Sequence, residues 1–221
     1  MTDALEPTKK YVYVKNGTFH RDFEGLYSDV DDPWKAEADP HGSFFRKKER
    51  LAEAILVDTV SSYLEIGCGR GIWLDRLKAS SNSNIIFSGA DISAVAIDAA
   101  TQRSPGISFD VLDIRYEIPR STHQVACLDS MLWYVMEDID ATLRNIFHRV
   151  DACWVVQFFW KDNEQQKYGR DIFHGQDGFT SKLRADGYDV YRDERIDIPD
   201  DPCFYLGFIC FRTLQVPRSC S

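Results

Sequence analysis

The sequence predicts an open α/β fold, a seven-stranded and mostly parallel sheet with helices on both faces. Short β-prone runs alternate with helically patterned segments along most of the chain, which is typical of βαβ units. A glycine-rich run follows the first of these β-prone runs, where a strand would turn into a helix. The length of 221 residues and the 44% hydrophobic content are those of one domain with a short extension.

The first 42 residues are polar and rich in turn formers, but they carry aromatic islands at 11–13, 19–27 and Trp34. Such a segment is too apolar for a free tail and too irregular for a domain. We expect residues 1–42 to be an arm that acts as a lid over a site, with a static pad over a sheet edge as the alternative. Residues 43–221 would form the single domain.

The domain is expected to open with a helix at 43–60, where Phe44, Leu51 and Ile55 recur at helical spacing. A strand at 63–66 follows and ends in glycines. Further helices are expected at 72–79, 93–103, 139–150 and 178–187, and further strands at 84–90, 107–112, 124–128, 153–159, 188–196 and 204–212. The last strand would close a hairpin with the one before it and so run antiparallel.

Residues 64–71 are the most informative run, with the sequence Leu-Glu-Ile-Gly-Cys-Gly-Arg-Gly. Glycines between a strand and a helix allow a tight turn and a close approach of a ligand to the backbone. A dinucleotide fingerprint would need a third glycine at Ile72, and a P-loop would need a lysine that the run lacks. The run therefore predicts a cofactor loop that does not hydrolyse nucleotides, and it weakens a dinucleotide interpretation.

Two acidic residues follow the next two expected strands. Asp91 stands where an open sheet places an acceptor for ribose hydroxyls, although it could instead cap the following helix. Asp113 lies between Leu112 and Ile114, a combination suited to the exocyclic amine and the face of an adenine. Together the three loops predict an adenosine site.

Glu65, the alternate glycines, Asp91 and Asp113 resemble the class I S-adenosylmethionine-dependent methyltransferases over about residues 50–212, which implies a Rossmann-like fold. Residues 31–34, 128–134 and 169–174 are similar to the nodulation-S-type branch. Its best-known members N-methylate an amino sugar of a chito-oligosaccharide, and its relatives methylate surface glycans and small metabolites. The chain departs from that branch at Ser130, which replaces an acid, and at 150–152, which replace a Pro-Gly-Gly turn.

The resemblance implies S-adenosylmethionine as cofactor and S-adenosylhomocysteine as product. It implies that Glu65 binds the methionyl amino end, that the backbone of 67–71 surrounds the methionine moiety and that Asp91 holds the ribose. The residues expected to contact the cofactor are Glu65, Gly67, Cys68, Gly69, Gly71, Trp73, Asp91, Ile92, Asp113, Ile114, Asp129 and Ser130.

The methyl acceptor is expected to contact Tyr27, Trp34, Trp133, Tyr134 and His174. Trp133 and Tyr134 either wall the acceptor site or pack as core aromatics. His174 is the candidate general base, because it lies in the long connection 161–177 that would overhang the crevice. The alternative for His174 is a loop histidine bonded to backbone or water.

We therefore expect methyl transfer from S-adenosylmethionine to an O or N atom of a small polar acceptor, with a sugar or glycan precursor as one candidate. The alternatives are a non-catalytic adenosyl-ligand sensor or partner subunit and, with less support, an NAD-linked oxidoreductase. A general base is required only if the acceptor is a hydroxyl or an ammonium.

The charge balance of 26 basic against 35 acidic residues gives a net charge of −9, which disfavours nucleic acid and anionic membranes as partners. The N-terminus has no apolar signal segment, and the six cysteines show neither a C-x-x-C pair nor metal-ligand spacing. We expect no metal, reduced thiols, a cytoplasmic location and a monomer or homodimer.

Overall fold

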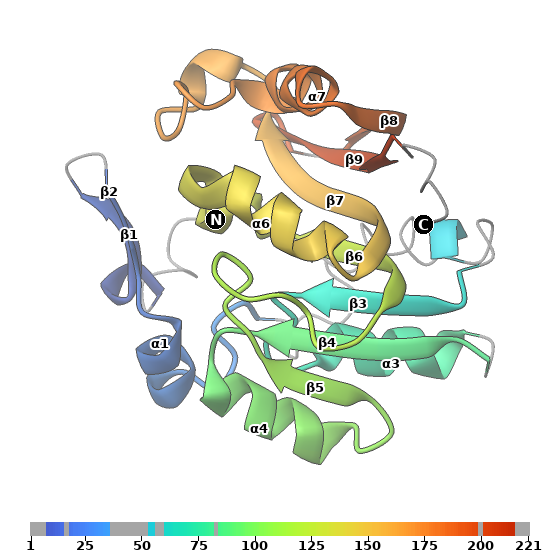
Figure 1. The fold of residues 1–221 in the computed structure, drawn as a ribbon. Helices are drawn as coiled ribbons and strands as arrows, with labels where there is room; N and C mark the ends of the chain where they lie inside the picture. The colour runs from blue at the N-terminus through green and yellow to red at the C-terminus, as the bar shows by residue number, and fades with distance from the viewer. Residues whose placement is uncertain are drawn as a thin grey trace.

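A computed structural model describes residues 8–15, 18–35, 53–55, 60–81, 84–198 and 201–214. Its centre is a seven-stranded sheet with the order β5-β4-β3-β6-β7-β9-β8 (Figure 1). The strands are β3 (Ser62–Ile66), β4 (Ile86–Asp91), β5 (Ser108–Val111), β6 (His123–Asp129), β7 (Val150–Trp160), β8 (Tyr188–Asp197) and β9 (Phe204–Thr213). Strands β3 to β7 pair in parallel, whereas β9 is antiparallel to both β7 and β8. The predicted fold class is confirmed, including the antiparallel last strand.

Helices cover both faces of this sheet and bury two separate cores (Figure 1). Leu64 and Ile66 of β3 face one core, while Tyr63 of the same strand faces the other, as the two-residue period of a strand requires. The first core includes side chains of α6 and α7, and the second includes side chains of α3 and α4. The helices are α3 (Ile72–Ser80), α4 (Ala94–Arg103), α5 (Leu132–Val135), α6 (Ile139–Phe147) and α7 (Gly175–Ala185), with 3₁₀ turns η2 (Thr8–Lys10), η3 (Met136–Asp138) and η4 (Asn163–Gln165).

The arm contains more regular structure than the sequence predicts. It forms the hairpin β1 (Val12–Lys15) and β2 (Thr18–Arg21), followed by α1 (Phe23–Asp29). Asp22 starts α1 by accepting a 2.8 Å hydrogen bond from the amide of Gly25. Figure 1 shows α1 on the side of the sheet toward which β3 and β4 point. The strands of the hairpin have four residues each, too short for a periodic signal.

Some expectations fall largely outside the described residues. Of the helix expected at 43–60, residues 53–55 and Val60 are described; 53–55 are helical and Val60 is not. Four of the five described cysteines are buried free thiols, and Cys203 is an exposed one. Within the ranges that the structure describes, no helix combines the length and apolar character needed to span a membrane.

Candidate functional site

The glycine loop after β3 is held by its own backbone amides. Gly67, Gly69 and Gly71 all have positive φ angles, of 76°, 53° and 69°, which L side chains adopt only at a cost. The amides of Gly67 and Cys68 donate to the carbonyl of Ala90, at 2.7 and 3.0 Å. The loop is thus fixed to the end of β4 before any ligand binds.

Asp91, at the end of β4, completes this attachment. Its Oδ2 accepts a 2.8 Å hydrogen bond from the amide of Gly69, and its Oδ1 accepts a 2.9 Å bond from the amide of Ser93. Ser93 itself caps α4, because its hydroxyl accepts from the amide of Ala96. Burial raises the pKa of Asp91, while the backbone amides of Ser93 and Gly69 oppose that rise. A carboxylate has about four lone-pair sites, so Asp91 keeps acceptor capacity for a ligand.

Asp113 carries an interaction that the sequence analysis did not predict. The guanidinium of Arg115 binds it in bidentate fashion, with Nε 2.8 Å from Oδ1 and Nη2 2.6 Å from Oδ2. This pairing raises the pKa of Arg115 and neutralises the carboxylate. Asp113 therefore presents its remaining lone pairs from a fixed, charge-balanced position.

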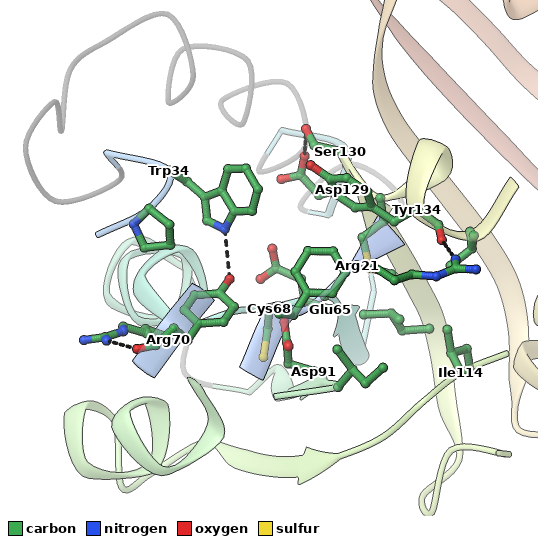
Figure 2. A pocket seen from close by; sticks show the side chains of 18 of the residues that line it. Arg21, Trp34, Glu65, Cys68, Arg70, Asp91, Ile114, Asp129, Ser130 and Tyr134 are labelled. Atoms are coloured by element: carbon green, nitrogen blue, oxygen red, sulfur yellow. Dashed lines mark hydrogen bonds between the residues drawn. The ribbon is translucent and has the colours of Figure 1, made fainter. Parts of the chain in front are cut away.

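These strand ends surround one cavity of about 430 Å³ (Figure 2). Most of the residues predicted to bind cofactor or acceptor line it, whereas Gly69, Gly71 and His174 do not. The predicted residues that line it are Tyr27, Trp34, Glu65, Gly67, Cys68, Trp73, Asp91, Ile92, Asp113, Ile114, Asp129, Ser130, Trp133 and Tyr134.

The arm forms one wall of the cavity with aromatic side chains. The indole of Trp34 donates a 2.9 Å hydrogen bond to the hydroxyl of Tyr27 (Figure 2). The ring of Tyr134 lies 5.2 Å from that of Phe23 and 6.3 Å from that of Trp34. Burial raises the pKa of Tyr134 to about 12. These tyrosines therefore stay neutral across the physiological pH range.

Polar contacts attach the arm to the rim of the cavity. Glu24 of α1 accepts a 2.6 Å hydrogen bond from the Ser93 hydroxyl at the start of α4. Arg70 of the glycine loop donates a 2.9 Å bond to the carbonyl of Tyr27. Arg21 donates to the carbonyl of Tyr134. Contacts at three separate points give the arm a defined position over the site.

The turn after β6 has an unusual backbone. Ser130 has a φ of 56°, one of the sparsely populated conformations that tend to occur at functional sites. Its amide donates a 2.7 Å bond to the carbonyl of Val156, and its hydroxyl donates a 3.0 Å bond to Asp129. Both side chains face the cavity near Trp34 (Figure 2).

Comparison with known proteins agrees with this geometry. Residues 64–152, from β3 into β7, match the family model described as a methyltransferase domain. This stretch is therefore similar to a methyltransferase domain. No curated protein matches the chain.

Solved structures of methyltransferases show that the chain has the class I fold. The magnesium protoporphyrin IX methyltransferase of Synechocystis PCC 6803 superposes with a TM-score of 0.61 at 14% identity, covering 96% of this chain and 98% of that one. The N-methyltransferase NodS of Bradyrhizobium japonicum WM9 superposes with a TM-score of 0.59 at 19% identity, covering 84% and 94%. A methyltransferase of Geobacter sulfurreducens gives 0.56 at 15%, covering 76% and 90%. The predicted class I fold is confirmed, and the narrower nodulation-S-type branch stays a prediction.

Trp133 packs as a core aromatic, while its role as a wall of the acceptor site stays a prediction. Its ring lies 5.7 Å from Phe159, 5.4 Å from Trp160 and 6.2 Å from Phe173, so it packs in an aromatic cluster at the end of β7. It also lines the cavity. Trp133 thus lies at the edge of the core and is partly exposed.

His174 lies away from the cavity. Helix α7 starts at Gly175, three residues earlier than expected, which makes His174 its N-cap residue. Its Nε2 lies 2.5 Å from the carbonyl oxygen of Asn163 in η4. This arrangement matches the alternative interpretation, a loop histidine bonded to backbone, and gives the predicted base no access to the cavity.

Several polar residues that line the cavity were not predicted, among them Gln157 and Arg115. Gln157 is 2% exposed in β7, and its Oε1 accepts a 3.0 Å bond from the amide of Leu132. A polar residue in an otherwise apolar strand is a signal that could have revealed it. Arg115 stands two residues from Asp113, and that spacing alone does not distinguish an ion pair from two solvated charges.

Proposed function

We propose that this protein transfers a methyl group from S-adenosylmethionine to an O or N atom of a small polar acceptor. The observation that carries the proposal is the convergence of Glu65, Asp91 and Asp113 on one cavity beside a glycine loop with positive φ angles. When bound, S-adenosylmethionine would supply a methyl group already activated on a sulfonium sulfur.

The residues fit this cofactor by their chemistry. Asp91 offers two carboxylate oxygens that are already oriented by backbone amides, as ribose hydroxyls require. Glu65 is 2% exposed and lines the cavity, so its carboxylate would face the methionyl ammonium. Apolar Ile92 and Ile114 line the same cavity as Asp113 and would take the adenine ring. A Cβ on Gly67 would overlap the side chain of Met131, so the loop has no room for a larger residue.

The other wall suits an acceptor. Trp34, Tyr134 and Trp133 present apolar surface, and Asp129 and Ser130 present polar groups at its edge. Such a lining excludes water and fits a molecule with apolar faces and hydroxyl or amino substituents, such as a sugar or glycan precursor. Position and desolvation would then supply much of the rate enhancement. With His174 outside the cavity, Asp129 is the ionisable side chain that we propose for the acceptor side.

An NAD-linked oxidoreductase is less well supported by the same loop. Pyrophosphate binding uses backbone amides at the start of a helix. Here the amides of Gly67, Cys68, Gly69 and Gly71 all donate to acceptors within the protein. These four loop amides are therefore not offered to a phosphate group, while Asp91 still offers acceptors for a ribose.

Incubation with methyl-labelled S-adenosylmethionine and a panel of hydroxylated and amino-substituted acceptors tests the proposal. Transfer of label to one acceptor class, abolished in a variant that no longer binds cofactor, is the expected result. Tight binding of S-adenosylhomocysteine with no transfer to any acceptor would instead favour a non-catalytic adenosyl-ligand sensor or partner subunit.

A further inference from the structure

The hydroxyl of Tyr27 lies directly over the glycine loop. A Cβ built on Gly69 would come within 2.6 Å of this oxygen. Gly69 is also the residue whose amide donates to Asp91. Tyr27 and Asp91 therefore approach the same residue of the loop, one from the arm and one from β4, and both line the cavity.

The electrostatics of Tyr27 agree with this placement. Tyr27 is 5% exposed, and its pKa is raised well above the usual value by burial first and by the Asp91 carboxylate second. The phenol thus keeps its proton and remains a donor. Its oxygen already accepts the hydrogen bond from Trp34.

The phenol proton has no acceptor in the part of the chain that the structure describes. Trp34 can only donate, so it fixes the oxygen of Tyr27 without using that proton. Asp91 is bonded to backbone amides, but a carboxylate has about four lone-pair sites and so keeps acceptor capacity for a ligand. The site therefore offers a donor and an acceptor that are close together and fixed on two different segments.

A hydroxyl group is the ligand that such a pair matches, because one hydroxyl can accept from Tyr27 and donate to Asp91. An anionic group would suit Tyr27 but would be repelled by the Asp91 carboxylate. The geometry points to Tyr27 as a cofactor-binding residue of the arm, which donates a hydrogen bond to a ribose hydroxyl shared with Asp91. This inference rests on the proposed function and moves Tyr27 from the acceptor to the cofactor.

Isothermal titration of the full chain with three kinds of ligand tests this assignment. S-Adenosylhomocysteine carries the ribose and the methionyl end, 5′-methylthioadenosine keeps the ribose but lacks the methionyl ammonium and carboxylate, and the 2′- and 3′-deoxy forms of the latter each lack one hydroxyl. Tyr27→Phe keeps the ring and removes the donor. Tyr13→Phe is the matched control, because Tyr13 lies on the arm hairpin, is 40% exposed and does not line the cavity.

Tyr27→Phe is expected to weaken S-adenosylhomocysteine and 5′-methylthioadenosine alike, by about two- to tenfold, the range for one neutral hydrogen bond. One of the two deoxy ligands lacks the hydroxyl that Tyr27 would bind, so Tyr27→Phe should bind that ligand as tightly as the wild type does. Tyr13→Phe should bind all ligands as the wild type does. A loss confined to S-adenosylhomocysteine would place Tyr27 at the methionyl end and overturn the assignment. So would an unchanged affinity, or an equal loss with both deoxy ligands.

Failure of the proposed function gives a different result. In that case the folded wild-type protein itself would not bind S-adenosylhomocysteine. Thermal melting of each variant shows that it is folded before it is titrated.

Discussion

The carboxylate of Asp91 and the backbone amide of Gly69 are joined by a hydrogen bond, with 2.8 Å between Oδ2 and the nitrogen. This bond links the end of β4 to the middle of the loop that follows β3. It places a buried, charged acceptor at the edge of the cavity and fixes the loop in the same interaction. Asp91 therefore affects both the stability of the fold and the proposed binding of the cofactor. A substitution at Asp91 is expected to change these two properties in different ways.

The buried charge of Asp91 is expected to lower stability at neutral pH. Its pKa in the folded protein is raised from the usual 3.8 by burial, so the folded state binds the proton at a higher pH than the unfolded state does. The contribution of Asp91 to the free energy of unfolding therefore falls as the pH rises from 3.8 through the raised pKa, and it is constant above that pKa. Asp91→Asn removes this dependence.

Thermal melting of wild type and Asp91→Asn between about pH 4 and pH 8 measures the effect, because all other titrating groups cancel in the difference. We expect the wild type to gain stability relative to the variant as the pH falls. A wild type that instead loses stability relative to Asp91→Asn on acidification would show that the carboxylate is stabilised by its amides more than it is penalised by burial.

Gly69→Ala is expected to weaken binding of S-adenosylhomocysteine while leaving the fold intact. The left-handed backbone costs a non-glycine residue about 1–2 kcal/mol, and the new methyl group would displace the Tyr27 hydroxyl. Gly187→Ala is the control, because Gly187 has a φ of 87° but a Cβ added there would have no other atom within 4 Å. Equal cofactor affinity in the two variants would contradict this prediction, because Gly187 does not line the cavity and its variant should bind as the wild type does.

The Glu24–Ser93 hydrogen bond is expected to hold the arm over the site. Glu24→Ala removes the acceptor at the start of α4, and a hydrogen bond to a carboxylate contributes about 1.5–3 kcal/mol. Amides of residues 18–35 should then exchange roughly ten- to a hundredfold faster with solvent. The control is Glu164→Ala, which removes an exposed carboxylate at η4. Unchanged exchange in Glu24→Ala would mean that the arm is held by its other contacts, as a fixed pad.

His174→Ala is expected to retain the turnover number of the wild type with its acceptor. The histidine occupies the N-cap position of α7 and bonds to the Asn163 carbonyl outside the cavity, so its loss removes no group from the site. Steady-state kinetics with the acceptor found in the labelled screen measures this. A fall of about a hundredfold or more at unchanged cofactor affinity would restore the role of general base.

The core of the domain was predictable because its signals are local. The apolar runs that became β3 to β9 and the glycines after β3 each report on a short stretch of backbone. The arm was not predictable in the same way. The partners Glu24 and Ser93 are 69 residues apart, and no periodicity in either segment indicates that they meet.

The rest of the site differs from the prediction in two small structural features. Helix α7 begins three residues earlier than the apolar pattern indicates, and this shift makes His174 a cap residue rather than a residue of the crevice. Asp113 was expected as an acceptor alone, but Arg115 folds back onto it. Such side-chain choices depend on the three-dimensional surroundings and leave no pattern in the sequence.

Calorimetric titration of wild type and Asp91→Asn with S-adenosylhomocysteine and with NADH tests the central claim most directly. We expect S-adenosylhomocysteine to bind the wild type, and Asp91→Asn to bind it about ten- to a hundredfold more weakly, since a charge-assisted hydrogen bond contributes about 1.5–3 kcal/mol. Asp98→Asn, on the exposed face of α4, should bind as the wild type does. A wild-type protein that bound NADH and not S-adenosylhomocysteine, or an Asp91→Asn variant with unchanged affinity, would contradict the account.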